Sequence, residues 1–216
     1  FRLARSRNNG AREASGDYLI FMDQDVIFNN DFIESIYNSR RKKRMIFSEA
    51  LSSSLEEKNK IQELINTQKF DYKEIYDLVD NTKKVEQDQI VNKEKFYNFL
   101  YKLKLRSRGA KIVGLIFSLF KEDFININGL DEKYIGYGYE DDDFGNRFFK
   151  YGGETFAFKM KRYPIHMYHK AASPNGSPNE DYYRQRKIEI SKKNYRCEYG
   201  YDKTFGEDKY KVIEIK

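Results

Sequence analysis

The sequence predicts an α/β fold, because short strand-like runs alternate with segments of helical pattern along the chain. The runs at 18–22 and 111–120 are apolar, aromatic and short, as expected of buried strands. The segment 32–39 follows Asn29-Asn30-Asp31, whose side chains favour a helix N-terminus, and 181–194 also has a helical pattern. Polar clusters follow the strands, and in open α/β sheets ligands bind beyond the carboxyl ends of the strands.

The same patterns predict the other elements. A helix is expected over 1–16, ended by Gly16 and interrupted at Asn8-Asn9-Gly10. Asn128-Gly129 predicts a turn, and a helix is expected to begin at the acidic residues 140–143, since carboxylates are favourable at a helix N-terminus. Further strands are expected over 45–50, 155–159, 162–168 and 209–215, and a loop over 173–178.

A long polar stretch, 54–105, separates two strand-rich parts of the chain. Its apolar residues Leu55, Ile61, Leu64 and Ile65 fall on one face of a helix. Because the stretch carries few residues with chemistry, we interpret it as a helical insertion within a single domain that covers 1–216. The 216 residues are enough for one such domain with a sizeable core.

The composition is basic, with 40 Lys and Arg against 34 Asp and Glu and a formal net charge of +6. This balance suits nucleic acid, an anionic membrane or a phosphorylated small molecule as a partner. The run Arg40-Arg41-Lys42-Lys43-Arg44 is interpreted as a solvated helix end, with contact to phosphates or to the inner face of a membrane as the alternative. A single cysteine and the absence of signal-peptide and membrane-spanning patterns favour a cytoplasmic location.

Asp23 and Asp25 directly follow the predicted strand at 18–22. Two carboxylates one residue apart can serve a hard divalent cation, directly or through water and ribose, and the cation neutralises a diphosphate. The spacing alone is weak, since Asp141 and Asp143 share it, and a plain exposed turn is the alternative. The position after a strand favours the first pair as the metal motif.

Both histidines of the chain, His166 and His169, lie three residues apart behind another predicted strand. Imidazole beside carboxylate suits Mn²⁺, Zn²⁺ or Fe²⁺ more than Ca²⁺. The spacing therefore predicts metal ligation, with a pair of partly exposed surface histidines as the alternative.

Four consecutive acids, Glu140-Asp141-Asp142-Asp143, follow a segment rich in glycine and tyrosine. Like charges this close repel, so at least one pKa is expected to be raised, and such a carboxylate can take a proton from a hydroxyl. The flanking Gly136, Tyr137, Gly138 and Tyr139 form a flexible, ring-lined approach that suits a sugar acceptor. A solvated acidic helix start is the alternative.

Together these segments resemble the GT-A glycosyltransferases, in particular family 2 enzymes and the C-terminal domain of the β-1,4-galactosyltransferases. The likeness is carried in order by four segments, which are 1–10 with Ala4, Asn8 and Gly10, 18–25, 125–147, and His169 with Ser173-Pro174-Asn175. It implies a GT-A fold, a mixed sheet flanked by helices. It also implies a partial domain, because the family's first β-α-β is not found before Phe1.

The resemblance further implies inverting transfer of a hexose or N-acetylhexosamine from a UDP-sugar to a glycan or glycoconjugate acceptor. Asp25, His166 and His169 would hold Mn²⁺ or Mg²⁺, although His166 falls where the galactosyltransferases use a methionine. Asp141 would be the catalytic base, and Glu140 would hold a sugar. The donor would contact Arg5, Asn8, Asp23 and Gly114. The acceptor would contact Tyr137, Gly138, Tyr139 and Asp142.

Some features depart from the family pattern and leave alternatives open. Tyr137 and Tyr139 replace a tryptophan and a glycine of the family, which puts the acceptor's identity in doubt. A sugar-phosphate nucleotidyltransferase would need a glycine-rich phosphate loop, which the sequence does not contain. A non-catalytic glycan-binding remnant is a further alternative. A nucleic-acid-binding domain is not expected, because the four acids would repel phosphates.

Overall fold

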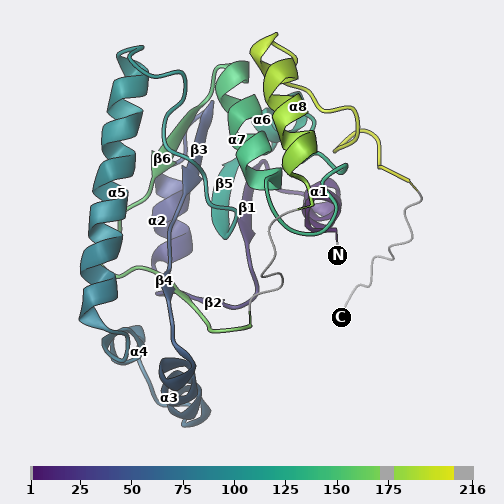
Figure 1. Cartoon of the computed structure of the whole chain (residues 1–216). Helices are drawn as coiled ribbons and strands as arrows, with labels where there is room; N and C mark the ends of the chain where they lie inside the picture. Colours follow the sequence, from purple (N-terminus) through teal and green to yellow (C-terminus); the bar gives the residue numbers. More distant parts are fainter. Residues whose placement is uncertain (1, 171–177, 207–216) are drawn as a thin grey trace.

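The computed structural model describes residues 2–170 and 178–206, and a four-stranded mixed sheet lies at its centre (Figure 1). In spatial order, the strands are β1 (Tyr18–Met22), β5 (Ile116–Phe120), β3 (Arg44–Phe47) and β6 (Glu154–Ala157). Strand β5 runs antiparallel to β1 and β3, whereas β3 runs parallel to β6. The predicted α/β class and the mixed sheet flanked by helices are confirmed.

Alternating side chains of these strands build a hydrophobic core on both faces of the sheet. On β3, Met45 and Phe47 join the larger cluster and Ile46 joins the smaller one, because successive strand residues point to opposite faces. The larger cluster is completed by the helices α1 (Leu3–Glu13), α6 (Lys121–Asn126) and α7 (Glu140–Tyr151). The smaller cluster is covered by α2 (Phe32–Asn38). A further helix, α8 (Glu180–Ser191), packs beside α7.

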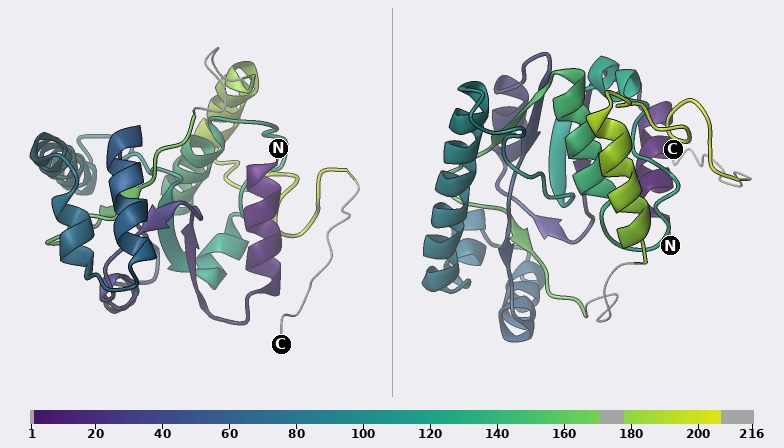
Figure 2. Two further views of the ribbon diagram at one scale, coloured as in Figure 1. Left: turned by 90° about the horizontal axis from the view of Figure 1, so that it is seen from below. Right: turned by 45° about the horizontal axis from the view of Figure 1, so that its top comes forward.

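The polar stretch that was predicted to be helical forms three helices, α3 (Leu55–Asn66), α4 (Tyr72–Asp77) and α5 (Asn81–Lys102). Each begins at a residue whose side chain accepts a backbone hydrogen bond, namely Ser54, Asp71 and Asp80. The buried side chains Ile61, Ile75 and Val91 anchor them to the main core. Helix α5 contacts β6 and β4, and it lies at one edge of the molecule in each view of Figures 1 and 2.

A second, smaller sheet lies beside the carboxyl end of β1. It consists of β2 (Val26–Ile27), β7 (Ile165–His166) and β4 (Leu51–Ser52), with β7 in the middle. Strand β2 is antiparallel to β7, and Val26 pairs with His166. The backbone N–H of Met167 donates to the carbonyl of Asp25 at 2.9 Å, which extends this pairing by one step. The small sheet therefore brings the residue after β1 next to the end of β7.

The first helix differs from its prediction, because the expected interruption at Asn8-Asn9-Gly10 does not occur and α1 continues to Glu13. Asn8 is fully buried, and its amide donates to the carbonyl of Leu130 at 2.8 Å while its oxygen accepts from the Leu130 N–H at 2.9 Å. These tertiary bonds satisfy a side chain that would otherwise compete with the helix backbone.

The strand expected over 111–120 is shorter than predicted, since β5 begins only at Ile116. Gly114 therefore precedes the strand, and its N–H donates to Asp141 Oδ2 at 3.2 Å. The predicted turn at Asn128-Gly129 is present, with φ of +65° and +63°. A Cβ on Gly129 would lie 2.5 Å from Asn8 Oδ1, so this position requires glycine.

Two other predicted strands are also shorter than expected, because β3 ends at Phe47 and β7 covers only Ile165–His166. The strand predicted over 209–215 and most of the loop predicted over 173–178 lie outside the described residues. Within the described ranges, the structure contains no helix that is both long and apolar enough to cross a bilayer.

Candidate active site

A cavity of about 1270 Å³ opens where the ends of β1 and β3, the segment before β5 and the start of α7 meet. Arg5 and Asn8 are the two predicted site residues that do not line it. The predicted residues that line it are Asp23, Asp25, Gly114, Tyr137, Gly138, Tyr139, Glu140, Asp141, Asp142, His166 and His169. The structure thus gathers the metal, donor and acceptor candidates from separate parts of the sequence.

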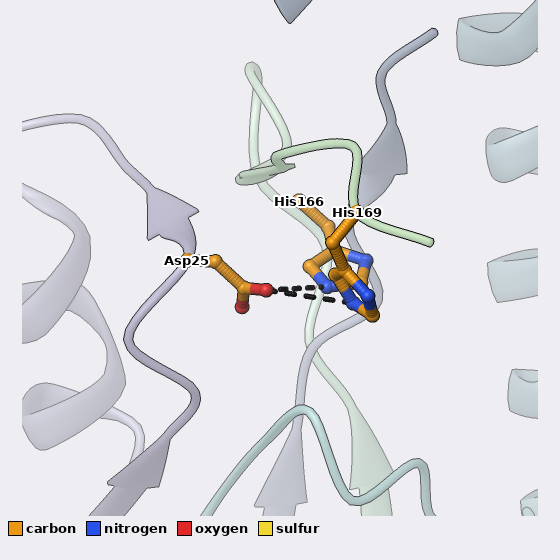
Figure 3. Close-up of side chains that lie close together, drawn as sticks. All are labelled: Asp25, His166 and His169. Carbon is orange, nitrogen blue, oxygen red and sulfur yellow. Dashed lines mark ion pairs between the residues drawn. The ribbon is translucent and has the colours of Figure 1, made fainter. Parts of the chain in front are cut away.

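Asp25, His166 and His169 form one cluster of candidate metal ligands, shown in Figure 3. Asp25 Oδ2 lies 3.3 Å from His166 Nε2 and 3.5 Å from His169 Nε2. One ligand atom from each residue lies within 4.8 Å of the others, a spacing that a single ion can bridge. A carboxylate with two imidazoles fits a divalent transition metal such as Mn²⁺.

The tautomer of His169 suits this role. Its Nδ1 lies 3.0 Å from the carbonyl of Lys170 and donates to it, which leaves Nε2 on the side of Asp25 as the atom that could bind a metal. Metal-ligating histidines commonly donate their second N–H to a carbonyl in this way. The His166 ring lies edge-on to the His169 ring, with centroids 5.1 Å apart, which places both rings on the same side of the aspartate.

Asp23 is held by Arg7, a residue that the sequence analysis missed. Arg7 Nη2 donates to Asp23 Oδ1 at 3.0 Å and to the carbonyl of Gly114 at 2.5 Å. Arg7 is buried and its guanidinium lies over the Phe117 ring, 5.4 Å from the centroid. It therefore fixes the loop after β1 against the segment before β5, at the point where the donor was expected.

The predicted donor contacts at Arg5 and Asn8 need correction. Arg5 pairs with Glu132 Oε2 at 3.0 Å, and Asn8 is fully buried against Leu130 and Glu132. In a helix, Arg5 and Arg7 point in opposite directions because two residues span about 200°. Arg7 and Asn8 lie on the buried face of α1 together with Ala4 and Ala11. The spacing of the two alanines therefore indicated that Arg7, and not Arg5, faces the protein.

Asp141 and Glu140 are two of the three carboxylates of α7 that line the cavity. Asp141 Oδ2 accepts from the Gly114 N–H, and Glu140 Oε2 accepts from the Gly138 N–H at 3.1 Å. Burial, and then the neighbouring charge of Asp142, raises the pKa of Asp141. Burial, and then Asp141, raises the pKa of Glu140. Two acids of the cluster thus have raised pKa values, for which burial is a larger cause than the expected repulsion between like charges. A carboxylate of this kind can serve as a general base.

The other two acids of the cluster, Asp142 and Asp143, face different neighbours from Glu140 and Asp141, because each residue turns about 100° around the helix axis. Asp142 lies at the cavity wall, 2.8 Å from Lys111 Nζ and 3.6 Å from Arg108 Nη1, so these cations engage the carboxylate that was predicted to contact the acceptor. Asp143 is fully buried and accepts from Arg147 Nε at 2.6 Å. Asp143 thus belongs to the core between α7 and α8.

The two tyrosines before α7 have different environments. Tyr139 precedes the helix with φ of +72°, and its ring stacks on Tyr183 of α8, with centroids 4.6 Å apart. Tyr137 is 61% exposed at the mouth of the cavity. Asn179 Nδ2 donates to the carbonyl of Gly138 at 3.1 Å and ties this loop to the start of α8. Both tyrosines line the cavity, and Tyr137 is the more exposed of the two.

Glu49, which follows β3, is a second cavity residue that the sequence analysis missed. Burial, and then the nearby charge of Glu94, raises its pKa to about 7, although Lys111 acts in the opposite direction. No local motif marks this position, because its environment is created by α5 and by the segment before β5.

Replacing Glu49 with glutamine is expected to stabilise the fold at alkaline pH. The pKa of Glu49 is about 7 in the folded protein, against 4.5 for an ordinary glutamate. A carboxyl with a raised pKa in the folded state lowers the free energy of unfolding as the pH rises between these two values. We expect Glu49→Gln to raise the free energy of unfolding by on the order of 2–3 kcal/mol at about pH 8 and by little below pH 4.5. Urea denaturation at both pH values measures this, with the exposed Glu86→Gln as control; a pH-independent difference would contradict the prediction.

Four of the five basic side chains at 40–44 contact acidic groups or aromatic rings. Lys42 Nζ lies 3.1 Å from Glu122 Oε2, and Arg44 Nη2 lies 2.6 Å from Glu154 Oε1. The guanidinium of Arg40 and the ammonium of Lys43 lie over the rings of Tyr37 and Tyr151. Most of this run therefore fastens the end of α2 to the sheet and to α6 and α7.

The fold and the sequence place this site in a known class of enzymes. The catalytic domain of Drosophila β1,4-galactosyltransferase 7, solved with xylobiose, matches with a TM-score of 0.55 and 18% identity. The match covers 99% of this chain and 67% of that one, and at this identity it establishes a shared GT-A fold. No curated protein sequence matches the chain.

Two family models match the sequence itself. The model of glycosyl transferase family 2 matches residues 1–118, and the model described as the N-terminal domain of galactosyltransferase matches residues 94–170. The first covers more than half of the chain. The protein is therefore a glycosyltransferase, and it belongs to glycosyl transferase family 2.

Proposed function

We propose that this glycosyltransferase transfers a hexose or N-acetylhexosamine from a UDP-sugar to a hydroxyl of a glycan acceptor, with inversion at the anomeric carbon. The observation that carries the proposal is that one cavity contains both the Asp25, His166 and His169 cluster and the partly buried carboxylate of Asp141. The first provides ligands for a divalent cation, and the second provides a base for the acceptor.

The cluster fits Mn²⁺ or Mg²⁺ as the resident ion, with Mn²⁺ favoured by the two imidazoles. When bound, such an ion offsets the negative charge that develops on the diphosphate leaving group. Asp23, which Arg7 holds in place, would contact the donor on the same side of the cavity. Gly114 lies beside Asp23, because Arg7 donates to both residues, and a Cβ on Gly114 would come within 3.1 Å of Arg7 and 3.3 Å of Asp141. Gly114 would therefore let the donor sugar approach the backbone next to Asp141.

Asp141 would take the proton from the acceptor hydroxyl. The acceptor oxygen then forms a bond to the anomeric carbon while the bond from that carbon to the diphosphate oxygen breaks, and UDP leaves with the electron pair. One displacement inverts the anomeric centre, and it needs no nucleophile from the protein. Burial, and then the charge of Asp142, raises the pKa of Asp141, which makes it a stronger base than an ordinary aspartate. Tyr137, exposed at the cavity mouth, offers a ring for the acceptor sugar.

Isothermal titration of UDP into the protein tests the donor and metal assignments together. We expect UDP to bind in the presence of Mn²⁺ and to bind at least tenfold more weakly after chelation, because the diphosphate would lose its counter-charge. GDP and ADP serve as controls for the base. Equal binding with and without the ion would contradict the metal assignment, and preference for another nucleoside diphosphate would contradict the UDP-sugar donor.

A further inference from the structure

The outward face of α5 carries a stripe of exposed apolar side chains. Val85, Phe96, Phe99 and Leu103 are each more than half exposed, and Leu105, which follows the helix, is 70% exposed. Spacings of three and four residues keep Phe96, Phe99 and Leu103, the residue that caps the helix, on one face. Val85 lies on the same face three turns earlier, beyond the polar residues Asp88, Gln89 and Asn92. We call these five residues the α5 apolar stripe.

The opposite face of α5 holds the helix on the protein. Val91 and Gln87 are buried there. Asn98 Oδ1 accepts from the Ala110 N–H at 2.8 Å and from Thr155 Oγ1 at 3.0 Å. Because the inward contacts occupy this side, the stripe points away from the molecule, at the edge that α5 forms in Figures 1 and 2. An exposed row of large apolar side chains of this kind marks an interaction surface.

Basic side chains flank the stripe. The segment from Lys93 to Lys111 contains seven Lys and Arg and one acid, Glu94. At 100° per residue, Lys93 lies on one side of the stripe and Lys95 lies on the other, next to Lys102, which pairs with Glu154 Oε2 at 3.0 Å. An apolar face bordered by lysines is the pattern of a helix that lies in a membrane interface, where the lysine stems extend toward the headgroups.

We propose that the α5 apolar stripe docks on the surface of an anionic lipid bilayer. The phenylalanine and leucine side chains would enter the boundary between headgroups and acyl chains, and the flanking lysines would face anionic headgroups. The flanking positive charges favour an anionic bilayer over a second copy of this chain, and the aliphatic side chains favour it over a nucleic acid. A second copy of the same face would set these cations against each other, and Val85, Leu103 and Leu105 have no ring on which a base could stack.

The stripe is distinct from the basic run at 40–44, whose cations contact Glu122, Glu154 and two tyrosine rings, although Glu154 pairs with both Arg44 and the flanking Lys102. It is also separate from the cavity, because none of the stripe residues lines it. The docking can therefore be tested without disturbing the site of glycosyl transfer.

Co-sedimentation with vesicles tests the proposal on the full chain. We expect binding to vesicles of phosphatidylcholine with about one third phosphatidylserine, weaker binding at high salt, and little binding to phosphatidylcholine alone. The triple variant Phe96→Gln, Phe99→Gln, Leu103→Gln should bind at least tenfold more weakly. Ile188→Gln, at an exposed position of α8, is the matched control and should bind as the wild type does.

Circular dichroism and UDP titration establish that the triple variant keeps its fold and cavity, and Lys93→Gln with Lys95→Gln provides a second variant that alters only charge. The proposal is overturned if the wild type does not bind anionic vesicles at low salt, or binds neutral vesicles equally well. It is also overturned if the triple variant binds vesicles like the wild type. A loss of dimerisation or of single-stranded RNA binding in the triple variant, with vesicle binding unchanged, would overturn it as well.

Discussion

Replacing Asp141 with asparagine is expected to lower the rate of glycosyl transfer by about 10²–10⁴-fold, the usual contribution of a general base. Asparagine has nearly the same shape, and its oxygen can still accept from the Gly114 N–H, which Asp141 Oδ2 accepts at 3.2 Å. It cannot take a proton from the acceptor hydroxyl. The variant should therefore bind UDP and Mn²⁺ as the wild type does and fail at the chemical step.

The pH dependence gives this prediction a second readout. Burial raises the pKa of Asp141, so the acid limb of kcat/KM should lie above the usual range of an aspartate, with activity falling as the pH falls through it. The limb should disappear in Asp141→Asn. The control is Asp181→Asn, in the first turn of α8 and exposed. Retention of more than a third of the wild-type rate in Asp141→Asn would assign the base elsewhere, with Glu140 next to be examined.

Replacing Asp25 with alanine is expected to weaken Mn²⁺-dependent binding of UDP by at least about 100-fold. Asp25 contributes the one anionic side chain of the cluster in Figure 3, and without it two neutral imidazoles remain to face the cation. His169→Ala removes one neutral ligand and leaves the charge, so its effect should be smaller. Titration calorimetry of UDP at saturating Mn²⁺ measures both variants.

The matched control for this experiment is Asp17→Ala, since Asp17 is an exposed aspartate just before β1 while Asp25 follows the same strand. It should bind UDP as the wild type does. If Asp25→Ala keeps the wild-type response to Mn²⁺, another group holds the ion and the cluster is an ordinary ion pair between an aspartate and two histidines.

Much of the fold could be predicted from the sequence, because its strands and helix starts depend on local patterns. Strand β1 and the start of α7 lie where they were expected, since an apolar run and an acidic helix N-terminus each carry their own signal. The metal candidates Asp25 and His166 lie close together, but the two-residue strand β2, which follows Asp25 and pairs with β7, was not predicted from the sequence.

Two of the failures share a cause, which is that the deciding contacts are distant in sequence. The environment of Glu49 depends on Glu94 and Lys111, and the burial of Asn8 depends on Leu130. The placement of Arg7 rather than Arg5 at the cavity could have been predicted, because Arg7 shares a helix face with Ala4 and Ala11. A pattern confined to neighbouring residues carries no information about partners that come from another element.

The pairing of β2 with β7 in the small sheet has a consequence for the stability of the protein. Asp25 and the two histidines come from opposite halves of the sequence, and the strands that join them are only two residues long. An ion bound by all three would act as a cross-link between the halves, and its binding free energy would add to the free energy of unfolding. Metal supply in the cell would then set the lifetime of the folded enzyme as well as its turnover.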